Sequence, residues 1–367
     1  MRKIAYIGVD YHINSLSIAV MLEGEKDFLE NVSLRNEYKV IRKYLQKLDK
    51  EYDLRVCYEA SCSGYVFQRK VNSWGFHCDV IAPSLVPNKP GDRRKNDFRD
   101  AKKLARNYCN GDLTIVSPPN EEQESVRSLS RCRLALKDGV KRTKNQINSF
   151  LLAHDERWMR SNWTHAHRSW LSKIKFSNPH LQTVMDENMG LLEYLESRVK
   201  HVEQQIQDLA CSEVYAPSVR KLCALRGIGP LSAMLLITEI TDFRRFASPK
   251  ALMAFLGLIP SEDSSGDKTK GKSITKAGNP RCRTQLVESV QHYSRRAVIG
   301  PSMKKNLAQV DAHSANIAVK CMNRLHKRYW ALIMKGKIRQ VAMTAVAREL
   351  VGFIWAMMNT DPVASPA

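Results

Sequence analysis

The sequence predicts an α/β domain followed by a mostly helical remainder, and three observations support this prediction. Short apolar, β-branched runs alternate with segments of helical periodicity over the first third of the chain, as in a sheet covered by helices. Two stretches with heptad spacing follow, and the final third keeps helical periodicity with many Lys and Arg residues. The expected domains are an α/β domain at 1–120, a helical coiled-coil region at 121–215, a mostly helical C-terminal domain at 216–361 and a disordered tail at 362–367.

Length and charge narrow the class of protein. A chain of 367 residues with 43% hydrophobic content is too long for one ordinary core, so two or three folded units are expected. The formal net charge of +21 comes from Lys and Arg spread along the whole length, so entire surfaces should be positive. Such surfaces favour phosphate polymers over the alternative of a merely soluble basic protein. We therefore expect a nucleic-acid partner.

The cysteines and the N-terminus point to a compartment. The nine cysteines are odd in number, are scattered singly and form no CxxC pair, which is typical of a reducing compartment and argues against structural zinc. The N-terminus passes from Met1-Arg2-Lys3 into an apolar strand without a signal-peptide pattern, and no apolar run is expected to approach membrane-spanning length. We expect a cytoplasmic protein with no membrane association.

Strands and helices of the first domain are placed by periodicity. The predicted order is a strand hairpin at 4–22, a helix at 38–48, a strand at 54–58, a helix at 64–73 and a strand at 76–82, after which prolines break the pattern. Asp10 stands where the first strand ends, and Glu59 follows a later strand. A single acid at a strand end is most often solvated, so the two gain meaning only together with further acids.

Two more acids follow the prolines. Asp97 and Asp100 lie three residues apart at a predicted helix start, and therefore on one face. With Asp10 and Glu59 they fit an RNase H-like arrangement, in which hard carboxylate oxygens hold Mg²⁺, with Mn²⁺ as the alternative, to neutralise charge on a phosphodiester. The basic residues just before the pair are expected to position a nucleic-acid backbone. They are Arg93, Arg94 and Lys95.

The middle of the chain leaves alternatives open. The heptad stretches at 121–152 and 192–209 fit an antiparallel helical pair, an oligomerisation coiled coil, or amphipathic helices packed on their own domain. Between them, Trp158, Trp163 and Trp170 fit either the tip of a helical hairpin or a basic-aromatic contact with nucleic acid.

In the C-terminal domain, Gly227-Ile228-Gly229 lies between two helical runs and resembles a helix-hairpin-helix. Paired glycines let backbone N–H groups approach a phosphate, so Gly227 and Gly229 are candidate nucleic-acid contacts, although a plain tight turn is the alternative. Residues 261–280 form a long polar loop or short hairpin, a length typical of functional loops.

Ser265, in Ser264-Ser265-Gly266, is a candidate nucleophile in this loop. A serine there is ordinarily a turn residue, but an exposed serine can attack phosphorus when it is oriented and the leaving group is stabilised. No general base is identifiable near it. The surrounding charge suits a scissile phosphate and comes from Lys268, Lys270, Lys272, Lys276, Arg281 and Arg283.

Six motifs together resemble the IS110/IS1111 family of insertion-sequence transposases, over nearly the whole length. The N-terminal motifs are GVDYH, CYEAS and KNDFRDAKKLA, and the C-terminal ones are RGIGPLSAMLLITEI, FLGLIPSEDSSG and GKSITKAGNPRCR. Asn96 and Phe98 depart from the more usual KTDRRDA, and Cys282 replaces a more usual leucine, without touching the acids.

The resemblance implies a bacterial, RNA-guided DNA recombinase. Its N-terminal domain would be a RuvC-like domain with the four DEDD acids, and its C-terminal domain would supply the serine that forms a covalent phosphoserine link to DNA. Ser265 is the best match, with Ser264 and Ser261 as alternatives, and the acids of another protomer would assist. The implied partners are donor and target duplex DNA, a structured non-coding bridge RNA, and further copies of the chain in a homodimer or homotetramer.

Two other functions compete with this one. The first is a Mg²⁺-dependent, RuvC-like nuclease that cuts DNA structures without a serine intermediate. The second is a non-catalytic nucleic-acid-binding protein, which the complete set of four acids argues against. The absence of a GxxxxGK[ST] loop agrees with a reaction that conserves the phosphodiester bond and needs no ATP.

Overall fold

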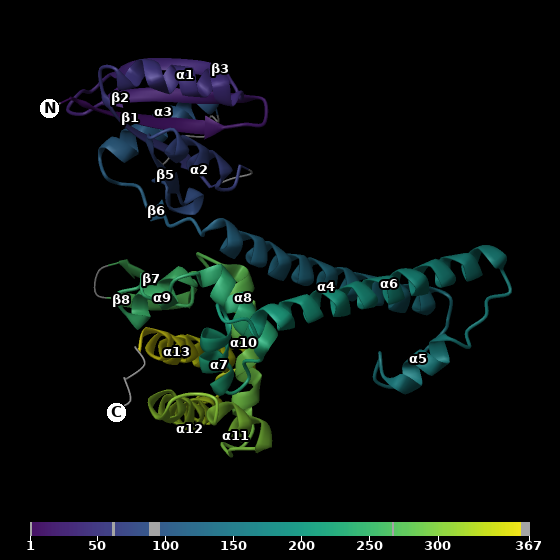
Figure 1. The fold of residues 1–367 in the computed structure, drawn as a ribbon. Coiled ribbons are helices and arrows are strands. Elements are labelled where there is room, and N and C mark those ends of the chain that lie inside the picture. The colour runs from purple at the N-terminus through teal and green to yellow at the C-terminus, as the bar shows by residue number, and fades with distance from the viewer. Residues whose placement is uncertain (1, 61–62, 88–95, 266–267, 361–367) are drawn as a thin grey trace. The chain divides into compact units, whose positions relative to one another are not determined.

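The computed structural model describes residues 2–60, 63–87, 96–265 and 268–360, with the side chains of Ser84 and residues 262–272 also outside the described part. The chain divides into two compact units, Met1–Pro119 and Asn120–Ala367, which are described separately below (Figure 1). Three predicted phosphate contacts, Arg93, Arg94 and Lys95, and the tail at 362–367 lie outside the described residues.

The N-terminal unit is built on a six-stranded mixed sheet with the order β3-β2-β1-β4-β5-β6. β1, β4 and β5 are parallel neighbours, whereas β2, β3 and β6 pair antiparallel. The strands are β1 (Ile4–Tyr11), β2 (Ser15–Leu22), β3 (Phe28–Arg35), β4 (Asp53–Glu59), β5 (His77–Ile81) and β6 (Ile115–Val116). The mixed α/β class predicted for this region is confirmed.

Helices cover both faces of this sheet (Figure 1). α1 (Tyr38–Asp49) and α2 (Val66–Ser73) pack on one face, where Ile41 and Phe67 join the buried side chains of the central strands. α3 (Asp97–Cys109) packs on the other face through Ala101 and Ala105, and the short η1 (Pro83–Leu85) follows β5. Both faces of the central strands are therefore buried, which explains their continuous apolar sequence.

The strand β3 was not predicted from the sequence. Its side chains alternate between half-buried and exposed, as expected for an edge strand, but Glu30 interrupts the apolar face. The carboxylate of Glu30 accepts a hydrogen bond of 2.6 Å from the Tyr44 hydroxyl of α1. A polar residue at an inward position is thus satisfied by a partner that is remote in sequence.

The C-terminal unit begins with a long helical arm. α4 (Glu121–Ala153) and α6 (Pro179–Ala210) run antiparallel along each other, and α5 (His165–Leu171) lies near their far end (Figure 1). Ion pairs of 2.7 Å between Arg133 and Glu203 and 2.8 Å between Lys144 and Glu196 join the two long helices. Of the alternatives for the heptad stretches, the structure shows the antiparallel pair.

The tryptophan-rich segment belongs to the far end of this arm. Trp163 and Trp170 are half-buried against a small core that includes Ile147, Leu171 and Leu192. The Trp158 ring lies 5.4 Å from the Trp170 ring, centroid to centroid. These contacts explain the tryptophans as the packing of a helical hairpin tip.

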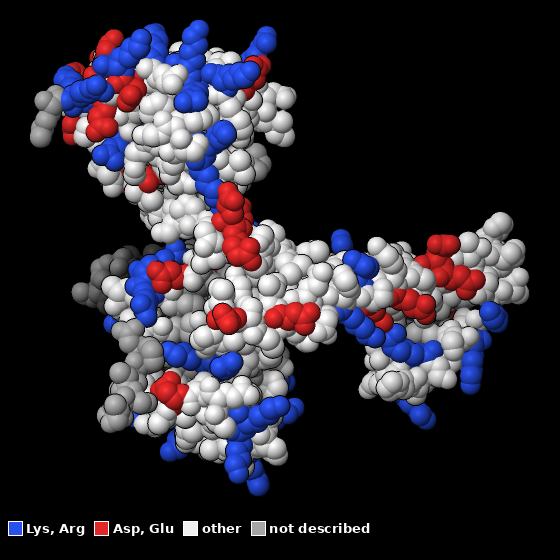
Figure 2. All heavy atoms as spheres, in the orientation of Figure 1, with Lys and Arg blue, Asp and Glu red and all other residues white. Residues whose placement is uncertain are grey.

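The rest of the unit is a helical body with one core. Its elements are α7 (Ala216–Ala224), α8 (Pro230–Ile240), α9 (Pro249–Phe255), β7 (Pro260–Ser265), β8 (Lys268–Ile274), α10 (Pro280–Ser289), η2 (Val290–Ser294), α11 (Pro301–Leu307), α12 (Ala312–Met334) and α13 (Arg339–Asn359). β7 and β8 form an antiparallel hairpin, so the polar segment at 261–280 is a hairpin in its first part. On the face drawn in Figure 2, Lys and Arg are spread over both units.

One expectation about membranes needs correction. Within the described residues, α13 is long and apolar enough to cross a membrane by length and composition, although no such run was expected. Val346, Leu350, Val351 and Ile354 of this helix are nevertheless buried among the other helices. The apolar sequence of α13 is therefore explained by its place in the core.

Candidate functional site

Two predicted acids lie at the same edge of the N-terminal sheet. β1 and β4 are parallel, and their register pairs Val9 with Tyr58. The next residue on each strand is an acid, Asp10 on β1 and Glu59 on β4. Carboxyl ends of parallel strands meet at one edge, so the pairing of the strands brings these two acids to neighbouring positions.

A glycine brings the helical acids to the same edge. A Cβ atom built on Gly8 would lie 2.3 Å from the Ala101 carbonyl oxygen and 2.4 Å from the Ala105 nitrogen. The backbone of α3 therefore rests directly on β1 at Gly8, two residues before Asp10 on the same face of the strand. Because α3 begins at Asp97, this contact places its first turn beside Asp10.

Within the described part of the chain, three possible metal ligands lie close together: Asp10, His12 and Asp97. One ligand atom from each lies within 4.8 Å of the others. The His12 Nε2 atom is 3.2 Å from the Asp10 Oδ2 atom and 3.6 Å from the Asp97 Oδ2 atom. His12 lies within the predicted hairpin at 4–22 and was not among the predicted ligands, although the alternation of strand residues puts it on the side of Asp10.

Asp10 is the most buried member of this group. Burial has the largest effect on the pKa of the Asp10 carboxyl and raises it, the charge and hydrogen bond of His12 lower it, and the negative charges of Asp97 and Asp100 raise it by smaller amounts, so the pKa is raised overall. The Asp10 side chain is 24% exposed, so solvent screens the repulsion only in part. Crowded carboxylate oxygens with one imidazole nitrogen form a donor set that fits a divalent cation such as Mg²⁺ or Mn²⁺.

The other two predicted acids take different places around this group. Asp100 lies one helical turn after Asp97, close enough to act on the Asp10 pKa. Glu59 is half-buried at its strand end, outside the group whose ligand atoms lie within 4.8 Å of one another. The structure thus brings Asp10 and Asp97 together most closely, and the role of all four acids as metal ligands stays a prediction.

The predicted nucleophile lies on the β7–β8 hairpin of the C-terminal unit. Ser265 is the last residue of β7 and pairs with Lys268, and Ser264 pairs with Thr269. The side chains of residues 262–272 are outside the described part, which includes those of Ser264, Ser265, Lys268, Lys270 and Lys272. Ser261, the third candidate, donates a hydrogen bond of 2.7 Å from its hydroxyl to the Ser273 carbonyl oxygen. It thus closes the base of the hairpin.

Two glycines fix where the hairpin leaves the helical body. Gly257 and Gly278 both have positive φ, +66° and +99°. A Cβ at Gly257 would lie 2.0 Å from the Ala277 carbonyl oxygen, and one at Gly278 would lie 1.9 Å from the Phe255 carbonyl oxygen. The two segments that flank the hairpin therefore cross with their backbones in contact, an approach that only glycine permits.

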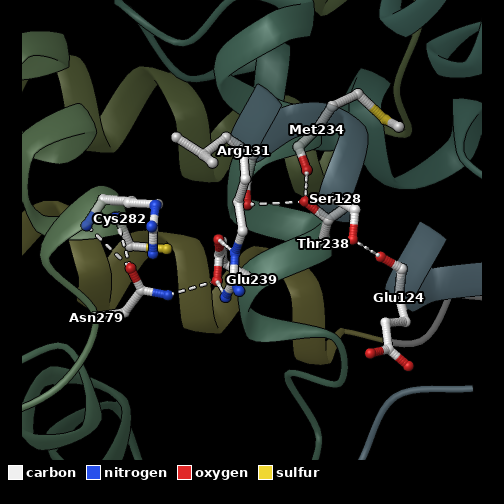
Figure 3. Close-up of polar contacts among 10 residues, drawn as sticks. Glu124, Ser128, Arg131, Met234, Thr238, Glu239, Asn279 and Cys282 are labelled. Atoms are coloured by element: carbon white, nitrogen blue, oxygen red, sulfur yellow. Dashed lines mark hydrogen bonds and ion pairs between the residues drawn. The ribbon is translucent and has the colours of Figure 1, made fainter. Parts of the chain in front are cut away.

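A buried carboxylate connects this crossing to the arm (Figure 3). The Glu239 carboxylate of α8 accepts hydrogen bonds of 2.7 and 2.8 Å from Arg131 of α4 and one of 2.6 Å from the Asn279 amide. The Asn279 side-chain oxygen also accepts from the backbone nitrogens of Arg281 and Cys282, which caps α10. These hydrogen bonds link α4, α8 and the start of α10. Asn279, which joins the network, directly follows Gly278.

Glu239 remains ionised in this position. Its side chain is 1% exposed, and burial alone would raise its pKa, but hydrogen bonds and charge from Arg131 and Asn279 lower that pKa overall. Glu239 was not among the predicted site residues, because a single Glu within the apolar run of α8 belongs to no recognisable motif. The neighbouring Cys282 is fully buried, and burial raises its pKa, so its thiol serves as a small apolar group.

The remaining predicted phosphate contacts differ in their surroundings. A Cβ at Gly227, where φ is +86°, would lie 2.2 Å from the Ser289 carbonyl oxygen, whereas a Cβ at Gly229 would meet nothing within 4 Å. Gly227 is thus required by packing. Both glycines line a cavity of about 460 Å³, and at Gly229 a side chain would meet only open space. Among the cations, Arg283 donates to the Leu256 carbonyl oxygen at 2.9 Å, while Lys276 and Arg281 are exposed.

Comparison with known proteins gives this arrangement a class. Residues 7–154 match the model DEDD_Tnp_IS110, described as a transposase, and residues 219–306 match the model of the transposase IS116/IS110/IS902 family. The first match includes α4 and the sheet edge that carries the four predicted acids, here called the acidic edge. The second includes the turn at Gly227 and Gly229 and the β7–β8 hairpin that carries Ser265, here called the serine hairpin. Fold and matches together define a transposase, an enzyme that acts on DNA.

Relatives extend the match over most of the chain. A putative transposase y4qE of Sinorhizobium fredii is 37% identical over 96% of this chain and 88% of its own length. The transposase for insertion sequence element IS1533 of Leptospira borgpetersenii is 29% identical over 92% and 99%, respectively. The transposase for IS1111A of Coxiella burnetii is 24% identical over 76% and 78%. The chain belongs to the IS110/IS1111 family of insertion-sequence transposases.

Proposed function

We propose that this transposase cuts and rejoins DNA through a covalent link between Ser265 and a DNA phosphate, guided by a structured bridge RNA that pairs with donor and target DNA. The family membership supports action on DNA. The single observation that carries the catalytic part is the convergence of Asp10, His12 and Asp97 beside Asp100, on an edge of the sheet that offers hard ligands. The guide RNA and the serine step rest on the resemblance.

The acidic edge is proposed to hold the metal. Asp10, Glu59, Asp97 and Asp100 are the predicted ligands, and His12 is a fifth candidate because of its distance from two of them. A divalent cation bound there would supply charge stabilisation at a phosphate. The chain itself would preorganise the carboxylates. The contact between Gly8 and α3 supports this, because it holds the first turn of α3 beside β1 without a substrate.

The serine step conserves the phosphodiester energy. The Ser265 oxygen would form a bond to phosphorus while one bridging P–O bond of the DNA breaks and leaves a strand hydroxyl. The hydroxyl of the exchanged strand would then attack the phosphoserine and release Ser265, so every step exchanges one P–O bond for another. The crossing of Gly257 and Gly278 and the Glu239 network would orient the hairpin for this attack.

The assembly is also part of the proposal. We place the enzyme in the bacterial cytoplasm as a homodimer or homotetramer on duplex DNA, with the acids of one protomer acting on the serine of another. Base pairing with the RNA would choose the sequence, and the spread of Lys and Arg over both units would hold the nucleic-acid backbones (Figure 2).

A strand-joining assay tests the proposal. The full-length protein is incubated with donor and target duplexes, Mg²⁺ and RNA transcribed from the non-coding part of its element, and recombinant DNA is amplified across the new junction. Joining should require the RNA and should be lost in Asp10→Asn and Ser265→Ala proteins. Cleavage that needs Mg²⁺ and Asp10 but persists in Ser265→Ala would instead identify the metal-dependent nuclease.

A further inference from the structure

One face of α12 carries a basic stripe that neither the acidic edge nor the serine hairpin uses. Its members recur at steps of four, three and one residues, so they lie on one side of the helix. The stripe consists of Lys320, Arg324, Lys327 and Arg328. The opposite side of α12, which includes Met322 and Tyr329, is buried in the core. The cations are therefore held on a fixed surface.

This stripe lines a groove of about 700 Å³ beside α13. Asn323, Ala331 and Phe353 complete its lining, and none of the described lining residues is acidic. Phe353 comes from α13 and is half-buried against the core. The groove thus combines a basic rim with an apolar and aromatic part.

Two of the cations, Arg324 and Arg328, contact a carboxylate of the neighbouring helix α13. The Arg324 Nε atom lies 2.9 Å and the Arg328 Nε atom 3.0 Å from the two carboxylate oxygens of Glu349 on α13, whose side chain is 19% exposed. Two guanidinium groups share this one carboxylate, so positive charge remains in excess. Only the Arg324 Nε–H group donates a hydrogen bond to Glu349, because the Arg328 Nε atom contacts the carboxylate as an ion pair without hydrogen-bond geometry. Both guanidinium groups carry further N–H donors. Such side chains are ready to bind an anion with little loss of conformational freedom.

The two parts of the groove match the two parts of an unpaired nucleotide. A backbone phosphate suits the Lys and Arg rim, and an unstacked base can lie on an aromatic ring such as Phe353. A base inside a duplex is stacked between its neighbours and offers no free face to such a ring. Charge complementarity and the aromatic residue therefore favour a single strand over a duplex.

We propose that the groove between α12 and α13 binds an unpaired stretch of a DNA strand. The source of that strand rests on the proposed function, because RNA that pairs with one strand of a duplex leaves the other strand without a partner. The displaced strand needs a surface that holds its phosphates and shields its bases. The groove offers both within one unit of the chain.

The test is direct binding, measured by fluorescence anisotropy with the full-length protein. The probes are a labelled single-stranded DNA of mixed sequence, its duplex, and single-stranded RNA of the same sequence. Lys320→Ala/Lys327→Ala should weaken binding of the single-stranded DNA roughly tenfold and reduce the slope of log affinity against log salt by about 0.7 for each cation that no longer meets a phosphate. Lys304→Ala/Lys305→Ala removes the same charge from α11, outside the groove, and should have the smaller effect.

A second variant separates stacking from charge. Phe353→Leu keeps an apolar side chain in the core but removes the ring, and should weaken binding of single-stranded DNA by about tenfold. Binding of the duplex should be unchanged in the same protein. A thermal unfolding curve that overlays that of the parent protein shows that the fold is kept.

Two results would overturn the proposal. One is equal loss of single-stranded DNA binding in the α12 and α11 double variants, with no effect of Phe353→Leu. The other is a greater loss of RNA binding than of DNA binding in the groove variants, which would assign the groove to RNA. Ser265→Ala protein should bind the single strand normally while it loses strand joining. Single-strand binding therefore tests the groove, and strand joining tests the serine chemistry separately.

Discussion

At the scale of single residues, the central feature is the crowding of carboxylates around Asp10. The pKa of Asp10 is raised mainly by burial and less by Asp97 and Asp100, and His12 offsets only part of this, so the ionised form is disfavoured in the folded protein without a cation. A raised carboxyl pKa costs folding stability at pH values above it, and a bound divalent cation would remove that cost. This makes cation binding measurable as a change in stability.

We predict that Asp10→Asn stabilises the metal-free protein and abolishes its response to Mg²⁺. Removing a charge that is disfavoured mainly by burial should raise the melting temperature in EDTA by about 3 °C. Added Mg²⁺ should then produce no further rise, whereas it should raise that of the parent protein. Differential scanning calorimetry with and without Mg²⁺ measures both effects.

The control is Asp53→Asn, at the opposite end of β4 with a side chain 56% exposed. It should leave the Mg²⁺ response intact. An undiminished Mg²⁺ response in Asp10→Asn would place the cation elsewhere.

At the scale of elements, the contact between β1 and α3 determines the acidic edge. We predict that Gly8→Ala lowers the free energy of unfolding by about 3 kcal/mol, because the new methyl group overlaps the backbone of α3. The displaced first turn of α3 should also weaken the Mg²⁺ response described above. Chemical denaturation with and without Mg²⁺ tests both effects.

Gly24→Ala provides the comparison for Gly8→Ala. At Gly24, φ is +78° and a Cβ would meet nothing within 4 Å. That substitution should cost about 1 kcal/mol through backbone strain alone and leave the Mg²⁺ response unchanged. Similar loss of the Mg²⁺ response in both variants would show that the edge does not depend on this contact.

The Glu239 network gives the second prediction at this scale. Glu239→Gln should lower the free energy of unfolding by about 2 kcal/mol at neutral pH, because Arg131 loses a charged partner. The pKa of Glu239 is lowered in the folded protein, so its contribution is present above the ordinary Glu pKa and is lost as the pH falls through the lower folded value. The difference between parent and variant should therefore shrink as the pH falls below about 4.

Urea denaturation across this pH range measures the Glu239 effect. Asp155→Asn, which removes the partner of Arg157 at a site where the two side chains are 83% and 64% exposed, should cost well under 1 kcal/mol across this range. A pH-independent difference for Glu239→Gln would mean that its charge does not support the network.

Local sequence patterns predicted most of the strands and helices but fewer of the residues that form the candidate site. The central strands and the long helices follow from apolar periodicity, and the strand-end acids could be read directly from sequence. The edge strand β3 was missed because Glu30 breaks the pattern and is satisfied only by the distant Tyr44. The roles of Gly8, His12 and Glu239 depend on partners brought close by folding, and no local pattern records them.

The turn between α7 and α8 also could not be interpreted fully from local sequence. Gly227 and Gly229 look equivalent in sequence, yet Gly227 is enclosed by Ser289 and Gly229 opens to space. Only the packing of η2 and α10 against the turn separates a structural glycine from one available to a ligand. The heptad spacing likewise did not determine that α4 packs against α6 within one chain.

At the scale of the whole molecule, the proposed assembly places the acids and the serine of one reaction on different protomers. We predict that a mixture of Asp10→Asn and Ser265→Ala proteins regains strand joining, because each mixed assembly contains one site with an intact acid and an intact serine. The yield should be a fraction of that of the parent protein. Each variant alone, at the same total concentration, should be inactive.

Persistent inactivity of the mixture, with mixed assemblies demonstrated by two affinity tags, would mean that the acid and the serine act within one protomer. That outcome would leave the chemistry unchanged and revise only the arrangement of copies. It separates the assembly from the catalytic claim.

The central claim is that Ser265 forms a covalent bond to DNA with the help of the acidic edge. The most direct measurement is covalent trapping, in which protein, RNA, labelled DNA and Mg²⁺ are mixed, denatured and separated on a gel, and the DNA-linked peptide is identified by mass spectrometry. We predict a labelled adduct at Ser265 that is absent from Ser265→Ala and Asp10→Asn proteins. DNA cleavage without an adduct, unchanged in Ser265→Ala, would contradict the claim.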